Sequence, residues 1–282
     1  MPRDCLLDLS VGLVEDVRSA DAPDPVVGAA AGFSPDFQLA LPYRGFFVWH
    51  VGRDEVAGDA NQALFVTGGE AYRLTRPLPC GYAELIVTPT PSVIDELAHT
   101  TGLSDLRCHP LFRRRSRRLT PQLLNFRARF LSWAANAPVD TLAAEEIVLA
   151  LLRAALDDDM PRLERPGRST QRLIRRTKAF LEAEFATPIR LDDIGRAVGS
   201  SPLYLTQIFR AVEGVPLHQY LTQLRLAHAL DALPSTSDLT QLALDVGFSS
   251  HSHFTSRFRR AFGTTPSRFR DLARRRLRPA TI

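Results

Sequence analysis

The 282-residue sequence predicts an α+β protein in which the strands precede the helices along the chain. Two patterns support this prediction. Short runs of β-branched and aromatic residues occupy 41–90, and helical spacing of apolar residues takes over after Pro91. A polar segment with two prolines, DDDMPRLERPGRS (157–169), then divides the chain and predicts an exposed linker. An apolar content of 45% is enough for real cores and excludes global disorder.

The strands are expected where the runs GFFVWHV, ALFVT, EAYRLT and AELIVT occur. Each run is bounded by Gly, Pro, Asn or Asp, as in GRDEVAGDAN and RPLPCG. Strands separated by turns at this spacing predict a small antiparallel sheet or barrel. Residues 1–40 are rich in Ala, Asp, Pro and Gly and show weak periodicity, so no element is predicted there.

Three helices are predicted between the strands and the linker. The first lies within 91–102, with Ser92 as its candidate N-cap and Gly102 as its stop. The second follows the cap Thr120 and has Pro121 at its first position, where proline is favoured. The third covers 140–156 and is rich in Leu and Ala.

The charge is distributed unevenly along the chain. From Arg168 to the C-terminus there are 18 basic and nine acidic residues, a net charge of +9. Residues 1–167 hold 17 basic and 22 acidic residues, a net charge of −5, and the whole chain carries +4. This asymmetry indicates that the C-terminal part meets a polyanion, either nucleic acid or an anionic membrane surface.

An internal repeat occupies this basic part. The segment SSPLYLTQIFRAVEGVPLHQY (200–220) aligns with SSHSHFTSRFRRAFGTTPSRF (249–269) at an offset of 49 residues. Each copy predicts a helix, a tight turn at Gly199 or Gly247, and a second helix capped by a serine. Two helices so joined form a helix-turn-helix unit, whose second helix enters the DNA major groove. The units span about 191–212 and 239–262, and the helical pattern of 216–233 predicts a connecting rod of about 25 Å.

The second helix of each unit leaves polar side chains outside its apolar stripe. Such side chains can donate to base edges or phosphates, although a single polar helix face is often merely solvated. Two equivalent faces in one basic region favour DNA binding. The outward residues are Leu203, Thr206, Gln207 and Arg210 in the first unit, and His251, Ser252, His253, Ser256, Arg257, Arg259 and Arg260 in the second.

The block from LDDIGRAVGSSPLYLTQIFR to LALDVGFSSHSHFTSRFRRAFGTTPSRFR resembles the AraC/XylS family of bacterial transcriptional regulators, over about residues 170–273. The Gly-Phe step, the Ser, the two Phe, the Gly and the Pro of its second half are similar to the family signature. The resemblance implies sequence-specific binding to double-stranded promoter or operator DNA and contact with RNA polymerase. It implies base contacts at Leu203, Thr206, Gln207, His251, Ser252 and Ser256, and phosphate contacts at Arg210 and Arg259. Because Leu203 is apolar, a thymine methyl group is the base feature that it could touch.

The front part, around YRGFF, GRDE and RPLPCGY, resembles the cupin-like sensor barrel that precedes this DNA-binding domain, over about residues 35–90. The resemblance implies a sensor and dimerisation domain at 1–158, a linker at 159–170 and an AraC-type DNA-binding domain at 171–275. The helices of 92–156 either mediate formation of a homodimer or only cap the barrel. Phe47 and Trp49 could line a pocket for a small-molecule effector, but core packing explains them equally well.

A cupin-type metal enzyme fused to a DNA-binding module is the alternative function. A two-histidine, one-carboxylate metal site needs clustered histidines, and 41–90 contains one histidine, His50. The sequence also lacks a nucleophile elbow, a P-loop and a dinucleotide fingerprint. Its three cysteines, at positions 5, 80 and 108, form no metal-binding cluster. We therefore predict no catalytic residue, no metal ligand and no cofactor.

The expected location is the cytoplasm. No apolar run reaches the roughly 18 residues of a membrane-spanning helix, and the N-terminus lacks the apolar core of a signal peptide. Widely spaced cysteines indicate reduced thiols. The arginine-rich run RRRSRR (113–118) is expected to form a solvated loop or, alternatively, a second DNA-contacting patch.

Overall fold

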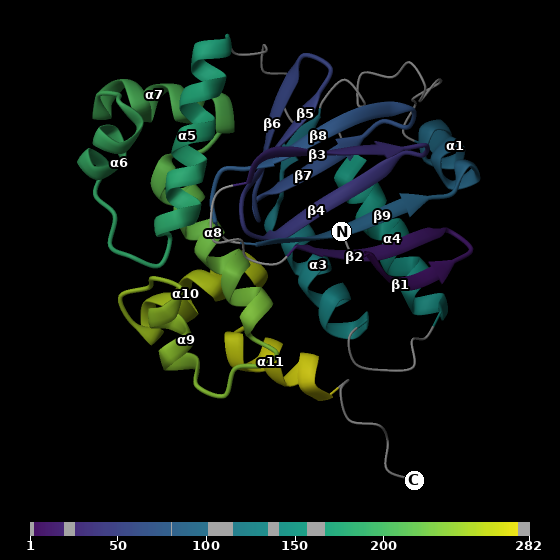
Figure 1. The fold of residues 1–282 in the computed structure, drawn as a ribbon. Helices are drawn as coiled ribbons and strands as arrows, with labels where there is room; N and C mark the ends of the chain where they lie inside the picture. Colours follow the sequence, from purple (N-terminus) through teal and green to yellow (C-terminus); the bar gives the residue numbers. More distant parts are fainter. Residues whose placement is uncertain are drawn as a thin grey trace.

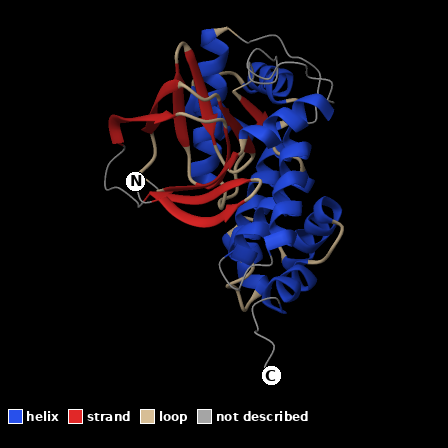
Figure 2. Cartoon of the chain, turned by 90° about the vertical axis from the view of Figure 1, so that its right-hand side faces the viewer, coloured by secondary structure: helices blue, strands red, loops and turns tan. Residues whose placement is uncertain are grey.

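In a computed structural model of the chain, the described residues are 3–19, 26–79, 81–100, 115–134, 141–156 and 167–275. Strands gather in the N-terminal half and helices in the C-terminal half, which confirms the predicted α+β class (Figures 1 and 2). The linker predicted at 159–170 lies mostly outside the described residues, and helix α5 already begins at Arg168. Within the described ranges, no helix combines the length and apolar character needed to cross a bilayer.

Ten strands in the described residues form two antiparallel sheets rather than one continuous ring. The first sheet has the order β1-β2-β9-β4-β7-β10 and the second the order β3-β8-β5-β6. The bounds are β1 Arg3–Leu9, β2 Gly12–Ser19, β3 Val26–Ser34, β4 Gln38–Arg44, β5 Phe47–Val51, β6 Asp54–Gly58, β7 Gln62–Val66, β8 Glu70–Arg76, β9 Tyr82–Pro89 and β10 Ser116–Arg118.

Strands β1, β2 and β3 lie in the segment where the sequence predicted no element. Their patterns explain the omission. In β2 the acids Glu15 and Asp16 are buried beside Val14 and Val17, so apolar and polar residues do not alternate. Strand β3, VVGAAAGFS, is built mostly from small residues that carry little strand propensity.

Apolar side chains of both sheets meet in a core between them. The first sheet contributes Val17, Ala40, Leu64, Val66 and Ile86, and the second contributes Phe47, Trp49, Val56 and Leu74. On the outer face of the first sheet, helices α1 (Pro91–Thr100), α3 (Pro121–Ala134) and α4 (Thr141–Leu156) join a second, larger core. The sheets are thus covered by helices on one side, as Figure 1 shows.

Thr120 and Ser92 were the residues expected to cap two of these helices. The Leu123 amide donates to the Thr120 hydroxyl oxygen over 3.3 Å, which confirms Thr120 as the cap of α3. Helix α1 begins at Pro91, so Ser92 lies in its first turn and the expectation that it caps the helix was wrong. The expected stop at Gly102 lies outside the described residues.

Seven helices make up the described part of the chain after the linker. Their bounds are α5 Arg168–Glu184, α6 Leu191–Val198, α7 Pro202–Glu213, α8 Leu217–Ala232, α9 Leu239–Asp245, α10 His251–Phe262 and α11 Pro266–Arg275. Helix α8 has 16 residues, so it is about 24 Å long. It runs between the pair α6–α7 and the pair α9–α10 (Figure 1).

The turn of each pair has the predicted chemistry. Gly199 and Gly247 have φ angles of 69° and 84°, which favour glycine. Ser201 caps α7 by accepting a hydrogen bond from the Tyr204 amide over 3.3 Å. Ser250 caps α10 by accepting one from the His253 amide over 3.1 Å. These local signals explain why the repeat could be found in the sequence.

Gly247 also fixes where the second pair sits. A Cβ atom at this position would lie 2.5 Å from the Phe185 carbonyl oxygen, just beyond the end of α5. Arg225 of α8 donates to that same oxygen over 2.7 Å and to the Thr187 carbonyl over 2.8 Å. The turn of the second pair is therefore packed directly against the end of α5.

Replacement of Gly247 by alanine should cost more stability than the same change at Gly263. Both glycines have a positive φ, but a Cβ at Gly263 would meet nothing within 4 Å. We expect Gly263→Ala to cost about 1 kcal/mol of unfolding free energy and Gly247→Ala about 3 kcal/mol, since the latter adds a clash with backbone. Urea unfolding of the two variants measures the difference. Equal losses would show that the close approach at Gly247 does not exist.

Candidate nucleic-acid interface

Helix α7 presents a mixed apolar and polar face. Leu205 and Phe209 are fully buried and hold the helix against its neighbours, while Leu203 is 71% exposed. Gln207 and Arg210 are exposed, and Thr206 is half-buried. The Thr206 hydroxyl donates to the Leu203 carbonyl over 2.9 Å, which leaves its oxygen as an acceptor. All four side chains expected to contact DNA in the first unit thus lie on accessible positions of one helix.

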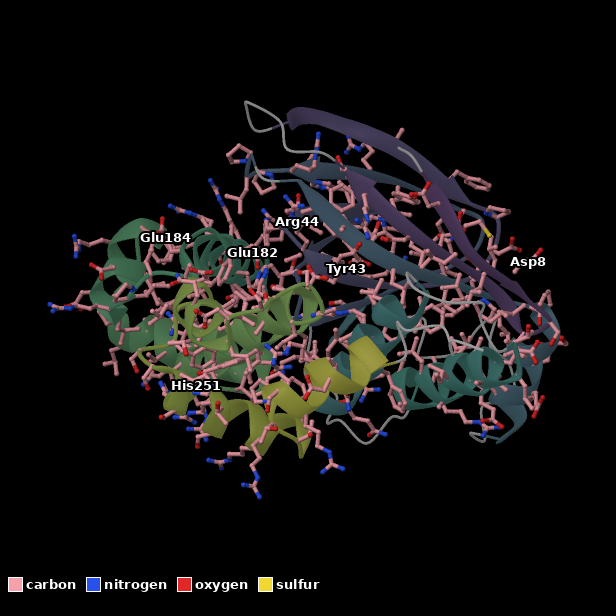
Figure 3. The ribbon with its side chains drawn as sticks, turned by 90° about the horizontal axis from the view of Figure 1, so that it is seen from below. Asp8, Tyr43, Arg44, Glu182, Glu184 and His251 are labelled. Carbon is pink, nitrogen blue, oxygen red and sulfur yellow. The ribbon has the colours of Figure 1, made fainter. Side chains whose placement is uncertain are left out.

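Helix α10 has the corresponding arrangement with more charge. Phe254 and Phe258 are fully buried. The side chains predicted to contact DNA are all exposed: His251, Ser252, Ser256, Arg257 and Arg259. Figure 3 shows His251 in the helical half of the molecule, away from the strands.

Histidine contacts order part of the α10 surface. The His253 ring lies 3.2 Å from the Ser249 hydroxyl and accepts a hydrogen bond from Arg257 Nε over 3.3 Å. The guanidinium of the exposed Arg257 is thereby held along the helix. His253 itself acts more as a support for Arg257 than as a free donor.

One exposed residue of α7 was not predicted. Tyr204 is 51% exposed, next to Leu203 at the start of the helix, and offers a ring face and a hydroxyl group. The helical spacing of the buried residues Leu205 and Phe209 did not predict that Tyr204 would be exposed. Its position in the first turn, directly after the cap, was the signal that could have identified it.

The comparison with known proteins concerns this helical region. A family profile described as a helix-turn-helix domain matches residues 194–272, from α6 to α11. The regulatory protein SoxS of Escherichia coli (strain K12) is 33% identical over 103 residues, which are 36% of this chain and 96% of SoxS. The chain belongs to the AraC/XylS family of transcriptional regulators.

Other relatives of this AraC-family regulator match over part of their length. The Msm operon regulatory protein of Streptococcus mutans is 28% identical over 141 residues, which cover 48% of this chain and 51% of that protein. The chain spans about half the length of the longer curated relatives it matches. A solved structure of a transcriptional regulator from Chromobacterium violaceum is 32% identical, covers 38% of this chain and 96% of that one, and has a TM-score of 0.36.

The arginine-rich run 113–118 of the regulator does not form the expected solvated loop where the structure describes it. Arg113 and Arg114 lie outside the described residues, but the others belong to or flank strand β10. Arg115 pairs with Glu70 and Asp54, and Arg117 donates to the Ala155 carbonyl over 2.8 Å. The solvated-loop hypothesis is therefore wrong for these described arginines, while the DNA-contacting alternative stays a prediction. Their guanidinium groups bind other parts of the same chain, a use that charge patterning alone does not show.

The front part of the regulator contains a cavity of about 270 Å³ between the two sheets, which we call the intersheet cavity. Phe47 and Trp49 line it, although they are only 1% and 3% exposed. Phe47 also lies over Gly58 of the neighbouring strand, where a Cβ atom would meet its ring at 2.4 Å. The two predicted aromatic residues thus take part in the core and in the cavity wall.

His50, the histidine weighed as a metal ligand, points into a different environment. Its ring lies 2.9 Å from the Thr75 hydroxyl and 3.6 Å from the Glu55 carboxylate. Burial lowers the pKa of His50 below its ordinary value. Among the described residues, no group of three or more His, Cys, Asp or Glu side chains is placed to hold a metal ion.

A set of buried polar residues connects the strands to the helices of the regulator. We call this set the interface cluster; it consists of Asp59, Asn61, Lys178, Glu213 and Tyr220. The Tyr220 hydroxyl donates to Asp59 over 2.5 Å, and the Asn61 amide donates to the Tyr220 carbonyl over 3.2 Å. Lys178 pairs with Glu213 over 2.8 Å and lies 5.4 Å from the centre of the Tyr220 ring. Residues from the β6–β7 turn, α5, α7 and α8 therefore meet in one network.

Further contacts surround the interface cluster. Arg118 of β10 donates to Gln223 of α8 over 2.7 Å, and Gln223 donates to the Leu119 carbonyl over 2.5 Å. Arg175 of α5 pairs with Glu55 of β6. A second cavity, of about 470 Å³, lies between α3, α8 and the first sheet. The interface thus combines these polar contacts with an apolar core that side chains of α3 share with those of α8.

Burial dominates the electrostatics of the cluster. Burial raises the pKa of Asp59 to about 6, although the charge of Lys178 and the hydrogen bond from Tyr220 oppose the rise. Burial likewise raises the pKa of the Tyr220 hydroxyl well above its ordinary value, and the neighbouring Asp59 charge adds to this. At neutral pH, Asp59 is therefore an ionised acceptor and Tyr220 a neutral donor.

The raised pKa of Asp59 predicts a pH-dependent stability difference between the wild type and Asp59→Asn. The folded state binds a proton at about pH 6 and the unfolded state only near 3.8, so the wild type loses stability as pH rises between these values. Relative to Asp59→Asn, the loss should reach about 3 kcal/mol and then remain constant above pH 6. Urea unfolding from pH 4 to 7.5 measures it. A stability difference between the wild type and Asp59→Asn that stays flat over this pH range would refute the account.

Proposed function

We propose that this AraC-family regulator binds a bipartite operator by placing α7 and α10 in two successive segments of major groove. The observation that carries this proposal is the pair of capped second helices, α7 and α10, each with an exposed polar face, linked through the single helix α8. Recognition helices about one DNA turn apart, roughly 34 Å, enter the groove on one side of the duplex. A rod of about 24 Å falls short of this spacing, so the DNA would bend toward the protein.

The roles within the interface follow from side-chain chemistry. Gln207, His251 and Ser252 are neutral groups that can hydrogen-bond to base edges, and they would carry sequence preference together with Thr206 and Ser256. Leu203 would contact a thymine methyl group. Arg210, Arg257 and Arg259 would bind phosphates and supply affinity that depends on salt.

The N-terminal part, 1–158, would act as the sensor and 171–275 as the DNA-binding domain. A small-molecule effector held by Phe47 and Trp49 in the intersheet cavity would alter the strands that carry the interface cluster, and so the placement of the recognition helices. We further propose that the regulator forms a homodimer, contacts RNA polymerase and acts in the cytoplasm. The chain would act by binding and not by catalysis. Stoichiometric iron, manganese or zinc in the purified protein would instead favour a cupin-type metal enzyme.

Selection of bound DNA fragments, followed by sequencing, tests the proposed function. We expect a motif with two boxes about one helical turn apart. Binding that shows no sequence preference and disappears at moderate salt would contradict the proposal, because charge alone supplies only non-specific affinity.

Single substitutions should separate the two boxes. Gln207→Ala should relax the sequence preference of one box only and His251→Ala that of the other, each at a cost of about 1–3 kcal/mol of binding free energy. Arg210→Ala should weaken binding to all sequences and reduce the salt slope by about one. Repeating the selection with each variant and measuring affinity against salt concentration checks these outcomes. A variant that alters both boxes equally would rule out the assignment of one helix to each box.

A further inference from the structure

Helix α5 carries a row of arginines in its N-terminal half. Arg168, Arg172 and Arg176 follow one another at intervals of four residues, so they lie on one side of the helix. The side chains of all three are exposed. We call these three residues the α5 arginine row, which extends over about 12 Å along the helix axis.

The α5 arginine row lacks acidic partners in the described part of the chain. No hydrogen bond or ion pair with another described residue holds the side chains of Arg168 and Arg172. Arg175, on the same helix, differs from them because it pairs with Glu55 of β6. The positive charge of the row is therefore available to a partner outside the described residues.

The charges of α5 are arranged opposite to the preference of a helix. Its basic residues lie between Arg168 and Lys178, whereas its acids, Glu182 and Glu184, lie near the C-terminal end. Cations stabilise a helix near its C-terminus and acids near its N-terminus, and like charges four residues apart repel one another. The α5 arginine row therefore costs helix stability, and a bound polyanion would relieve that cost.

The α5 arginine row lies beside the first helix-turn-helix unit. Arg176 donates through Nη2 to the Ala197 carbonyl over 3.0 Å, near the end of α6 and just before the Gly199 turn. Helix α5 also packs against α7. In Figure 1, the N-terminal end of α5 extends past α7, on the side away from α9 and α10. Arg168 and Arg172 therefore lie at the outer end of the first unit.

We propose that the α5 arginine row binds the phosphate backbone of DNA that flanks the operator box read by α7. The inference rests on the proposed function and extends its interface beyond α7 and α10. A duplex carries one charge per about 1.7 Å of its axis, so a row of about 12 Å faces several phosphates. Arginine suits phosphate because its planar fork donates two parallel hydrogen bonds. Such contacts add affinity without sequence preference.

Operator duplexes of different length locate the contact. The α7 box is the one whose sequence preference Gln207→Ala relaxes. A core duplex holds the two boxes, and two longer duplexes add one helical turn of about 10 base pairs outside either the α7 box or the α10 box. We expect the wild type to bind the duplex extended at the α7 box more tightly than the core duplex. Equal affinity for these two duplexes would overturn the proposal.

Removal of two charges of the row identifies the residues. In the double variant Arg168→Gln/Arg172→Gln, the extension at the α7 box should no longer raise affinity. On that duplex, the slope of log affinity against log salt concentration should be smaller by about two. Between about 50 and 200 mM salt, the wild type should therefore lose about tenfold more affinity than the double variant.

The other duplexes decide whether the effect is local. The double variant should bind the core duplex and the duplex extended at the α10 box like the wild type. A double variant that binds the duplex extended at the α7 box like the wild type would contradict the proposal. So would an equal loss of affinity on all three duplexes, because that would place the effect within the boxes.

Stability and a second exposed arginine serve as controls. Because the row opposes the helix dipole, the double variant should unfold at the same urea concentration as the wild type or at a higher one. Arg153 is exposed on α4, so Arg153→Gln removes one charge from the N-terminal part and should leave the salt slope unchanged. A less stable double variant would show that the row supports the fold. A smaller slope for Arg153→Gln would show that net charge acts in place of the row.

Non-specific DNA separates this inference from the proposed function. Selection of two boxes, with no effect of the double variant on any duplex, would leave the proposed function intact and remove the α5 arginine row from the interface. Binding without sequence preference, with a salt slope that still falls by about two in the double variant, would contradict the proposed function and retain the row as a DNA-binding surface.

Discussion

The hydrogen bond between Asp59 and Tyr220 joins the two halves of this regulator at a buried position. Asp59 follows strand β6, Tyr220 lies in α8, and both side chains are essentially removed from solvent. Tyr220 also packs edge-on against Phe209 of α7, with ring centres 5.2 Å apart. The contact that ties the strands to the linking helix therefore also supports the first recognition helix. Lys178, which is paired with Glu213 over 2.8 Å, is the cation whose charge favours the ionised form of Asp59.

This arrangement places the interface cluster close, along the chain, to the intersheet cavity. Phe47 and Trp49 on β5 pair with Gly58 and Val56 on β6, and Asp59 comes directly after Gly58. Because the Phe47 ring lies against Gly58, a ligand that moves this ring would press on the residue before Asp59. In the proposed function, the β5–β6 hairpin would connect effector binding to the support of α7. Two arrangements of this hairpin, with different affinities for the ligand, would be required for such coupling.

The sequence predicted those parts of the structure that depend on local signals. Glycine turns, serine caps and the spacing of Leu205, Phe209, Phe254 and Phe258 identified both helix-turn-helix units, because each signal acts within a few residues. The strands of 1–40 escaped prediction because buried acids and small residues break the usual pattern. The interface cluster could not be predicted from the sequence because its partners are distant along the chain. Asp59 and Tyr220 are separated by 161 residues, and no local pattern indicates that they meet. Likewise, the sequence did not predict the partners of Arg115, Arg117 and Arg118, because the acids, carbonyls and amide that they contact are distant along the chain.

A double-mutant cycle between Asp59 and Tyr220 tests the joining of the two halves most directly. The unfolding free energies of the wild type, Asp59→Asn, Tyr220→Phe and the double variant are compared at pH 7.5. The structure predicts a coupling free energy of about 1 kcal/mol or more, as expected for buried residues in direct contact. Changes that add within about 0.3 kcal/mol would show that the two residues do not meet, and would contradict the account of how the strands hold the DNA-binding helices.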